Sequence, residues 1–182
     1  MTALPAALDH LRHPKLRRLA AYWLERRGSR ELPRRADIDP VDVPWALLDI
    51  ALYDHVAEVG RFRCRVAGQR VTEMIGVPMQ GRFLDEILPE RLYAVVGQRY
   101  ARMIQERAIV HSHGAVYGAH GKSSQGERLV LPLGDDDGRA AGYVTMTTYD
   151  PHQKAEVERL IGPRPYEDVT FTPVTALAAP TR

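Results

Sequence analysis

The sequence contains a single cysteine, Cys64, among its 182 residues. One thiol cannot form an internal disulfide, which favours a reducing compartment such as the cytoplasm. No run of residues is apolar enough to span a membrane, and residues 1–13 lack the apolar stretch of a signal peptide. The net charge is only +2, so no excess of one sign points to nucleic acid. We therefore expect a cytoplasmic protein of one domain with extensions, with neither a membrane nor a nucleic-acid partner.

The clearest pattern is the alternation of Phe62, Cys64 and Val66 with three arginines. Such alternation is typical of a strand with one dry face and one wet face. A short helical run over residues 69–75 follows this strand. Gly76 comes directly after the run and suits the end of a helix, because glycine readily takes the left-handed conformation found there.

Periodicity along the rest of the chain predicts one longer helix and three more strands. The helix covers residues 89–107, and the strands cover 109–117, 128–133 and 141–149. Residues 45–55 fit either a helix or a strand, and we take residues 48–54 as the first strand because the family resemblance described below implies one there. The last three strands follow one another through short links, so they should pair as an antiparallel meander. We therefore predict the α+β class, with a five-stranded antiparallel sheet and helices on one of its faces.

An amphipathic helix is predicted before this sheet, beginning at Pro14 and ending at Gly28. Its apolar stripe consists of Leu16, Leu19, Trp23 and Leu24. A stripe of this kind must be covered by another apolar surface. We expect it to pack against the sheet or against the same helix of a second copy, which would make it a homodimer interface.

These elements divide the chain into three parts. Residues 1–40 form a helical extension, residues 41–150 form the α+β domain, and residues 151–182 form a tail. Within the tail, residues 152–161 could form one short helix before Gly162. The remainder carries four prolines without periodicity, so we expect it to be disordered or packed on the body of the domain.

Several short motifs, taken in order, carry a family resemblance. They are Tyr22-Trp23, Arg27-Gly28-Ser29, the LP-x-R-x-DIDP segment Leu32–Pro40, Phe62–Gly68, Gly76–Glu86, Leu131-Pro132-Leu133 and the acidic turn Gly134–Gly138. Together they resemble PAS domains, and more narrowly a family of short bacterial proteins with one PAS domain each. Gln69 departs from the pattern, because the family more often has threonine there.

This resemblance implies a sensory or interaction module of bacterial signalling. Such modules often form homodimers, and a chain of this size would act through a partner signalling protein. The resemblance also allows a small-molecule ligand between the sheet and the helices. It names no cofactor and implies no enzyme activity, since a fold alone does not determine a function.

The candidate ligand-binding residues are Cys64, Met74, Tyr93, Val96, Tyr100, His111, His113 and Met146. Tyr93 and Tyr100 lie on one side of the predicted long helix, where their hydroxyls could bind a ligand. His111 and His113 share one strand face and could line a cavity, or could hold a metal with a third ligand. The nearest third histidine, His120, lies in a glycine-rich loop, so we predict no metal site.

Two cofactors and two other functions can be weighed in the same way. Cys64 lacks the helical sequence context of flavin-binding PAS domains, and helix 89–107 lacks the histidine used by haem-binding ones.

One alternative function is a protein–protein adaptor with a filled interior and no ligand. The other is a small α+β enzyme, which would need an inward acid or base such as Asp49, Asp54 or His111.

Overall fold

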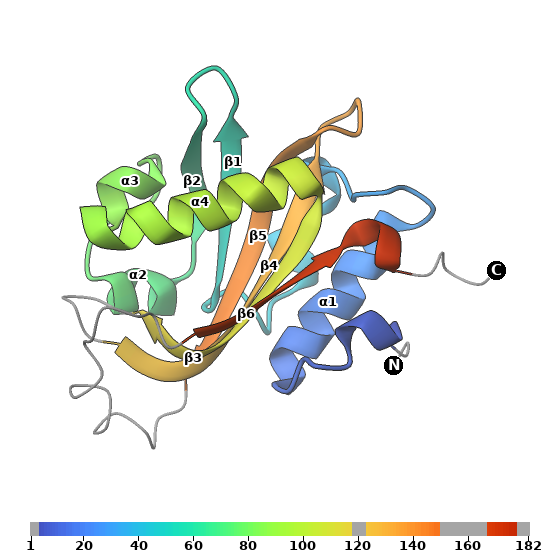
Figure 1. Ribbon diagram of the computed structural model, residues 1–182, viewed down its shortest axis with the longest axis horizontal. Helices are drawn as coiled ribbons and strands as arrows, with labels where there is room; N and C mark the ends of the chain where they lie inside the picture. The colour runs from blue at the N-terminus through green and yellow to red at the C-terminus, as the bar shows by residue number, and fades with distance from the viewer. Residues whose placement is uncertain (1–3, 118–122, 150–166, 178–182) are drawn as a thin grey trace.

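The computed structural model describes residues 4–117, 123–149 and 167–177, which form one sheet and the helices around it (Figure 1). The strands are β1 (Ile50–Val56), β2 (Arg61–Ala67), β3 (Ala108–Tyr117), β4 (Ser123–Gly134), β5 (Ala140–Tyr149) and β6 (Glu167–Pro173). The α-helices are α1 (Pro14–Arg27), α2 (Gln69–Ile75), α3 (Leu84–Ile87) and α4 (Glu90–Glu106). Short 3-10 helices lie at Ala6–Leu8, Arg35–Asp37, Pro40–Asp42 and Val174–Ala176. None of the helices described is long and apolar enough to cross a membrane.

All six strands belong to one antiparallel sheet with the order β2-β1-β5-β4-β3-β6. The predicted meander of β3, β4 and β5 is confirmed. The strand β1 begins at Ile50 instead of 48, because the backbone before it turns through hydrogen bonds from Asp49 and Ile50 to the Ala46 carbonyl. The strand β4 begins before the predicted residue 128, because the preceding residues pair with β3 despite their turn-forming composition.

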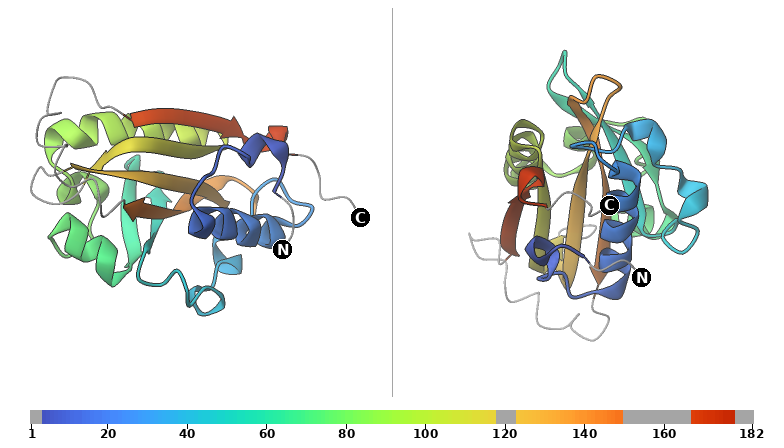
Figure 2. Two further views of the ribbon diagram at one scale, coloured as in Figure 1. Left: turned by 90° about the horizontal axis from the view of Figure 1, so that it is seen from below. Right: turned by 90° about the vertical axis from the view of Figure 1, so that its right-hand side faces the viewer.

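Helices cover both faces of the sheet, with α1 on one side and α2, α3 and α4 on the other (Figure 2). Because side chains alternate along a strand, each strand contributes to both cores. On β4, Leu129 and Leu131 belong to the core under α1, whereas Val130 belongs to the core under α4. The prediction of helices on one face holds for α2–α4, and α1 covers the opposite face.

The sequence at both ends of α1 explains where the helix begins and ends. Pro14 occupies the first turn, where its missing N–H costs nothing, and the Nδ1 atom of His13 accepts a hydrogen bond from the backbone N–H of Lys15. Gly28 ends the helix at a φ of 56°, which residues with a Cβ rarely adopt. Both predicted ends are confirmed.

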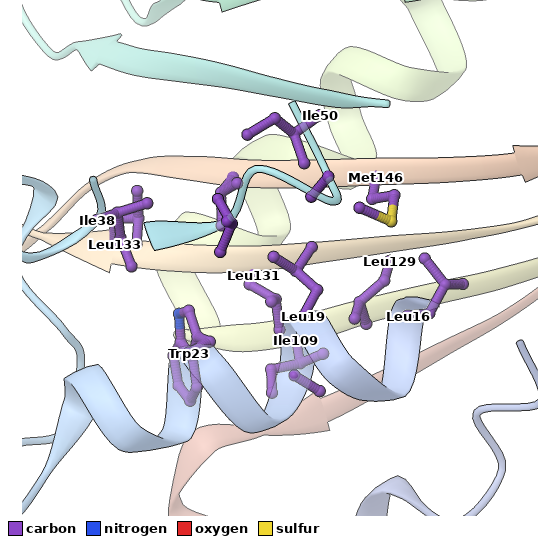
Figure 3. Close-up of a cluster of buried hydrophobic side chains, with 14 of the residues drawn as sticks. Leu16, Leu19, Trp23, Ile38, Ile50, Ile109, Leu129, Leu131, Leu133 and Met146 are labelled. Carbon is purple, nitrogen blue, oxygen red and sulfur yellow. The ribbon is translucent and has the colours of Figure 1, made fainter. Parts of the chain in front are cut away.

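The apolar stripe of α1 packs against its own sheet (Figure 3). Leu16, Leu19 and Trp23 are at most 1% exposed, and Leu24 is partly buried against the same core. The indole N–H of Trp23 donates to the carbonyl of Pro132 over 2.8 Å. Of the two coverings expected for this stripe, the sheet is the one observed. The three buried side chains therefore have no free area to offer a second copy as a homodimer interface.

The sheet has six strands instead of the five predicted, because part of the tail pairs with β3 as β6. Val169 and Phe171 of β6 pack on the α4 side of the sheet. A nearly buried ion pair joins Arg99 of α4 to Glu167 at 2.8 Å, with the two side chains 9% and 3% exposed. The predicted short helix at 152–161 lies outside the described residues, and the division of the chain into three parts stays a prediction.

Candidate functional site

A cavity of about 40 Å³ lies between the sheet and the three helices α2, α3 and α4. Its apolar wall is formed by Val71, Ile75, Met79, Leu84, Ile87 and Leu88 from the helical segment. Its sheet wall is formed by Ala51, Tyr53, Arg128, Tyr143, Thr145, Thr147 and Tyr149, and α4 adds Tyr100. The cavity therefore has one apolar side and one side rich in hydroxyl groups, a composition typical of small-molecule sites.

Aromatic rings fill much of the space beside this cavity. The ring of Tyr143 stacks on Tyr53 with centroids 4.9 Å apart and contacts Tyr100 at 4.8 Å and Phe62 at 5.5 Å. Burial raises the pKa of Tyr53 well above its usual value, so its phenol stays protonated. Tyr53 can therefore give a ligand a hydroxyl group to bind but no negative charge.

The polar end of the cavity is organised around Arg128 of β4. Its side chain points to the α4 side of the sheet, and its Nε donates to the Oγ1 atom of Thr147 over 2.8 Å. Arg128 is only 6% exposed. Burial raises the pKa of the nearby Tyr149, whereas Arg128 lowers it. The cavity thus has a guanidinium beside hydroxyl groups, an arrangement suited to a carboxylate or carbonyl oxygen.

Of the predicted ligand-binding residues, Tyr100 alone lines this cavity. Val96 is buried in the same core, and Tyr93 is partly buried against it. Cys64 is fully buried there, and desolvation raises the pKa of its thiol to about 11, so it is an unreactive apolar residue. Met74 is partly buried on α2 and does not line the cavity.

The other three predicted residues lie on the opposite face of the sheet. Met146 is buried in the core under α1. His111 and His113 do share one strand face, as expected, and His111 Nε2 lies 2.7 Å from the Oε1 atom of Glu127. The described residues contain no group of three side chains placed to bind a metal, and His120 lies outside them. The sheet therefore separates the predicted residues into two groups that cannot meet one ligand.

Comparison with known proteins decides the family. The family model described as "PAS domain" matches residues 11–145, which is most of the chain. The chain belongs to the PAS-domain family. A solved structure, the PAS domain of BvgS from Bordetella pertussis, matches with 18% identity and a TM-score of 0.49, covering 68% of this chain and 95% of that one. No curated protein matches.

The PAS domain also has an open surface cleft of about 400 Å³ near the turn between β4 and β5. Arg34, Arg35 and Arg65 line it together with Asp54 and two aspartates of the turn. Asp54 is 3.0 Å from Arg65 and 3.6 Å from Arg35, so the charges within the cleft pair with one another. This cleft is a solvated ion-pair network that fixes the segment before β1 to the sheet.

The acids considered for an enzyme lie outside the cavity of the PAS domain. Asp49 is buried, and its carboxylate accepts hydrogen bonds from Lys15 Nζ and Arg70 Nη1. Asp54 pairs with arginines in the surface cleft. His111 lies on the α1 side of the sheet. None of the three residues therefore lines the cavity beside Tyr100.

Proposed function

We propose that this PAS domain is a sensory module that binds a small molecule between the sheet and helices α2–α4. The observation that carries the proposal is the cavity itself, with Arg128 and Thr147 at one end and aliphatic side chains at the other. A ligand that matches both ends has a short apolar body and an oxygen-bearing group, such as a short-chain carboxylate.

The size of the cavity limits how such a ligand binds. A space of about 40 Å³ holds ~3 water molecules, whereas pockets for drug-sized ligands measure roughly 300–1,000 Å³. A ligand of more than a few atoms therefore requires α2 and α3 to move outward. Both helices are short, with seven and four residues. The helix α2 has no fully buried residue to withdraw, whereas outward movement of α3 must break the ion pairs of Arg61 with Asp85 and Glu86. Binding would favour the expanded arrangement and so change the surface that a partner meets.

We propose that the bound state is read by a partner signalling protein, and that the domain forms a homodimer in the cytoplasm. The single cysteine, which excludes an internal disulfide, supports a reducing setting. A homodimer of the fold described here would use surface other than the buried stripe of Leu16, Leu19 and Trp23. We propose no catalytic role, because none of the described residues that line the cavity is a carboxylate or a histidine.

Titration with a homologous series tests the ligand site. The probes are acetate, propionate, butyrate and hexanoate, each compared with its neutral amide, and the readout is chemical-shift change in isotope-labelled protein. We expect shifts at Val71, Ile75 and Thr147, and stronger binding of carboxylates than of amides. Thr147→Val removes the hydroxyl that holds Arg128 and should weaken binding by about five- to tenfold.

Thr148→Val is the matched control for Thr147→Val. Thr148 is the next residue on β5, and its hydroxyl donates to the carbonyl of Glu127 away from the cavity. It should leave the affinity unchanged while making the same chemical change in the same strand. Equal losses of affinity in the two variants would contradict the ligand site. The absence of chemical-shift changes at the cavity with every probe would also contradict it.

The second candidate function is an adaptor without a ligand. The small cavity and the packed tyrosine rings favour it, because a filled interior leaves little to sense. In an adaptor, Ala51→Leu should fill the cavity and stabilise the domain without changing partner binding. In a sensor, the same substitution should abolish the response to the carboxylates.

A further inference from the structure

The segment that leads into α1 lies on the face of the sheet opposite the cavity. We call residues 4–13 the N-terminal arm (dark blue in Figure 2). The arm buries Leu8 and Leu11, which are 0% and 2% exposed in the core under α1. Its last two backbone N–H groups, those of Arg12 and His13, donate to the two carboxylate oxygens of Glu127 over 2.9 and 2.8 Å. One side chain of β4, that of Glu127, therefore accepts both backbone hydrogen bonds at the end of the arm.

Glu127 is itself held by a histidine of the neighbouring strand. His111 Nε2 lies 2.7 Å from Oε1, and Glu127 is only 4% exposed. A carboxylate only accepts hydrogen bonds, so His111 donates through Nε2. Burial raises the pKa of Glu127, but the hydrogen bonds from His111 and the two backbone N–H groups lower it to about 2. Glu127 is therefore ionised and already has three donors at neutral pH.

His10 of the arm completes this cluster. Its ring packs against the ring of His111, with centroids 4.8 Å apart. Its Nε2 atom is buried and has no hydrogen-bond partner among the described residues. A proton added at this atom would place a positive charge in a buried position without an acceptor, beside an imidazole that already donates to Glu127. A neutral His10 meets no such penalty.

The other charged groups around His10 do not offset this penalty. Burial is the largest influence and lowers the pKa of His10, and His111 lowers it further, against smaller opposing effects of Glu127, the backbone of Ala7 and Asp9. On β3, His113 lies 3.2 Å from the Nη1 atom of Arg12, so that part of the cluster carries positive charge. From α1, Arg17 Nη1 donates to the carbonyl of Leu11. The acids near His10 are Glu127 and Asp9, and neither accepts a hydrogen bond from its Nε2 atom.

We propose that the N-terminal arm is an acid-released contact, docked on the sheet while His10 is neutral and undocked when His10 takes up a proton. The direction of the pH effect follows from the linkage between docking of the arm and protonation of His10. In the docked arm the pKa of His10 lies below its free value of 6.5, so docking is unimpaired above that pH and weakens as the pH falls below it. Undocking would expose Leu8, Leu11 and the sheet surface beneath them. This regulation lies on the other face from the proposed ligand site, and its test requires no ligand.

Hydrogen exchange of the full chain measures the docking directly. Protection factors of the arm amides, corrected for intrinsic rates, are compared between about pH 7.5 and about pH 5.5. We expect the protection of Leu11, Arg12 and His13 to fall by about threefold or more at the lower pH. Amides of α4 should keep their protection, because the domain stays folded.

Two substitutions of His10 and one control identify the titrating group. His10→Phe keeps an aromatic ring against His111 and cannot be protonated, so its arm should show no fall in protection. His10→Gln also lacks the titration and tests the same point if phenylalanine disturbs the packing. His55→Phe is the control, because His55 is another partly buried histidine whose pKa burial lowers, and its ring lies tilted against Phe62 of the other core.

The variants distinguish titration of His10 from titration of another group. A pH-dependent arm in the wild type and in His55→Phe, with a pH-independent arm in both His10 variants, supports the proposal. An arm equally protected at both pH values in the wild type overturns it. A fall in protection that persists in both His10 variants also overturns it, because another group would then be responsible.

Discussion

Gly142 of β5 lies so close to β1 that a side chain has no room. It pairs with Asp54, and a Cβ atom built on it would overlap the carbonyl oxygen of Tyr53, which belongs to the rigid backbone of the sheet. Tyr53 in turn stacks on Tyr143 beside the cavity. The smallest possible residue at this position therefore fixes the spacing of two strands that build the sheet wall of the candidate site.

We predict that Gly142→Ala destabilises the domain by about 2–4 kcal/mol, because β1 and β5 must separate to admit the methyl group. Gly134→Ala is the matched control. Its Cβ would meet its nearest neighbour, Leu32, at 3.4 Å, so the change should stay within about 0.5 kcal/mol. Urea unfolding followed by circular dichroism measures both values. Equal effects would show that the close approach at Gly142 carries no strain.

Single residues also decide how much of the candidate site can be predicted from the sequence. The alternation of Phe62 and Cys64 correctly placed both side chains in a core, because one face of β2 is polar. Arg128 was missed, because both faces of β4 are covered and the leucines beside it gave no sign that the arginine is also buried. The side of the sheet on which His111 lies was likewise not predictable, because a strand buried on both faces does not show which helix each residue faces.

At the scale of elements, β6 is the strand that the sequence predicted least well. It has seven residues, ends in a proline and follows a segment without periodicity, so its alternation of Val169 and Phe171 gave a weak signal. The helices were easier, because capping residues mark their ends. Glycines end α1 and α2, and Pro89 precedes α4.

We predict that the ion pair between Arg99 and Glu167 helps to fix β6 to the domain, in addition to the pairing of β6 with β3. Glu167→Ala leaves the arginine buried without its partner and should cost about 3–5 kcal/mol. The loss should appear first as faster hydrogen exchange of the β3 amides beside β6, with α1 unaffected.

Two further variants test this account of β6. Asp168→Ala removes an exposed carboxylate from the adjacent residue and should change little. Replacing both partners, Arg99→Met with Glu167→Met, should recover most of the lost stability, because no charge then remains buried. A double variant as unstable as Glu167→Ala would argue against the ion pair as the cause.

At the scale of the whole molecule, one sheet separates two hydrophobic cores. The core under α1 contains Leu19 and Leu131, and the core under α4 contains Val96 and Tyr143. Because every strand from β1 to β5 has residues in at least one of these cores, loss of either core should unfold the sheet. The α1 helix is therefore a structural part of the domain and not an optional addition.

We predict that Leu19→Asp unfolds the domain, since an unpaired carboxylate in the core costs several kcal/mol, about half or more of a typical domain's stability. Val95→Asp is the control, because Val95 is 41% exposed on α4. It should stay folded with an unchanged mass. Circular dichroism and light scattering measure fold and mass together. A folded monomer from Leu19→Asp and a dimer from the wild type would instead make α1 a dimer interface.

The positions of the two tryptophans have a practical consequence. Trp23 lies in the core under α1, and Trp45 packs against the same core with the guanidinium of Arg18 4.3 Å above its ring. Both tryptophans are thereby accounted for, and the aromatic residues described in the opposite core are tyrosines and phenylalanines. Fluorescence excited selectively in the indoles therefore reports on one side of the sheet without any attached dye. If the indole emission changes on adding acid but stays constant on adding a metabolite, the two experiments distinguish events on the two faces in a single cuvette.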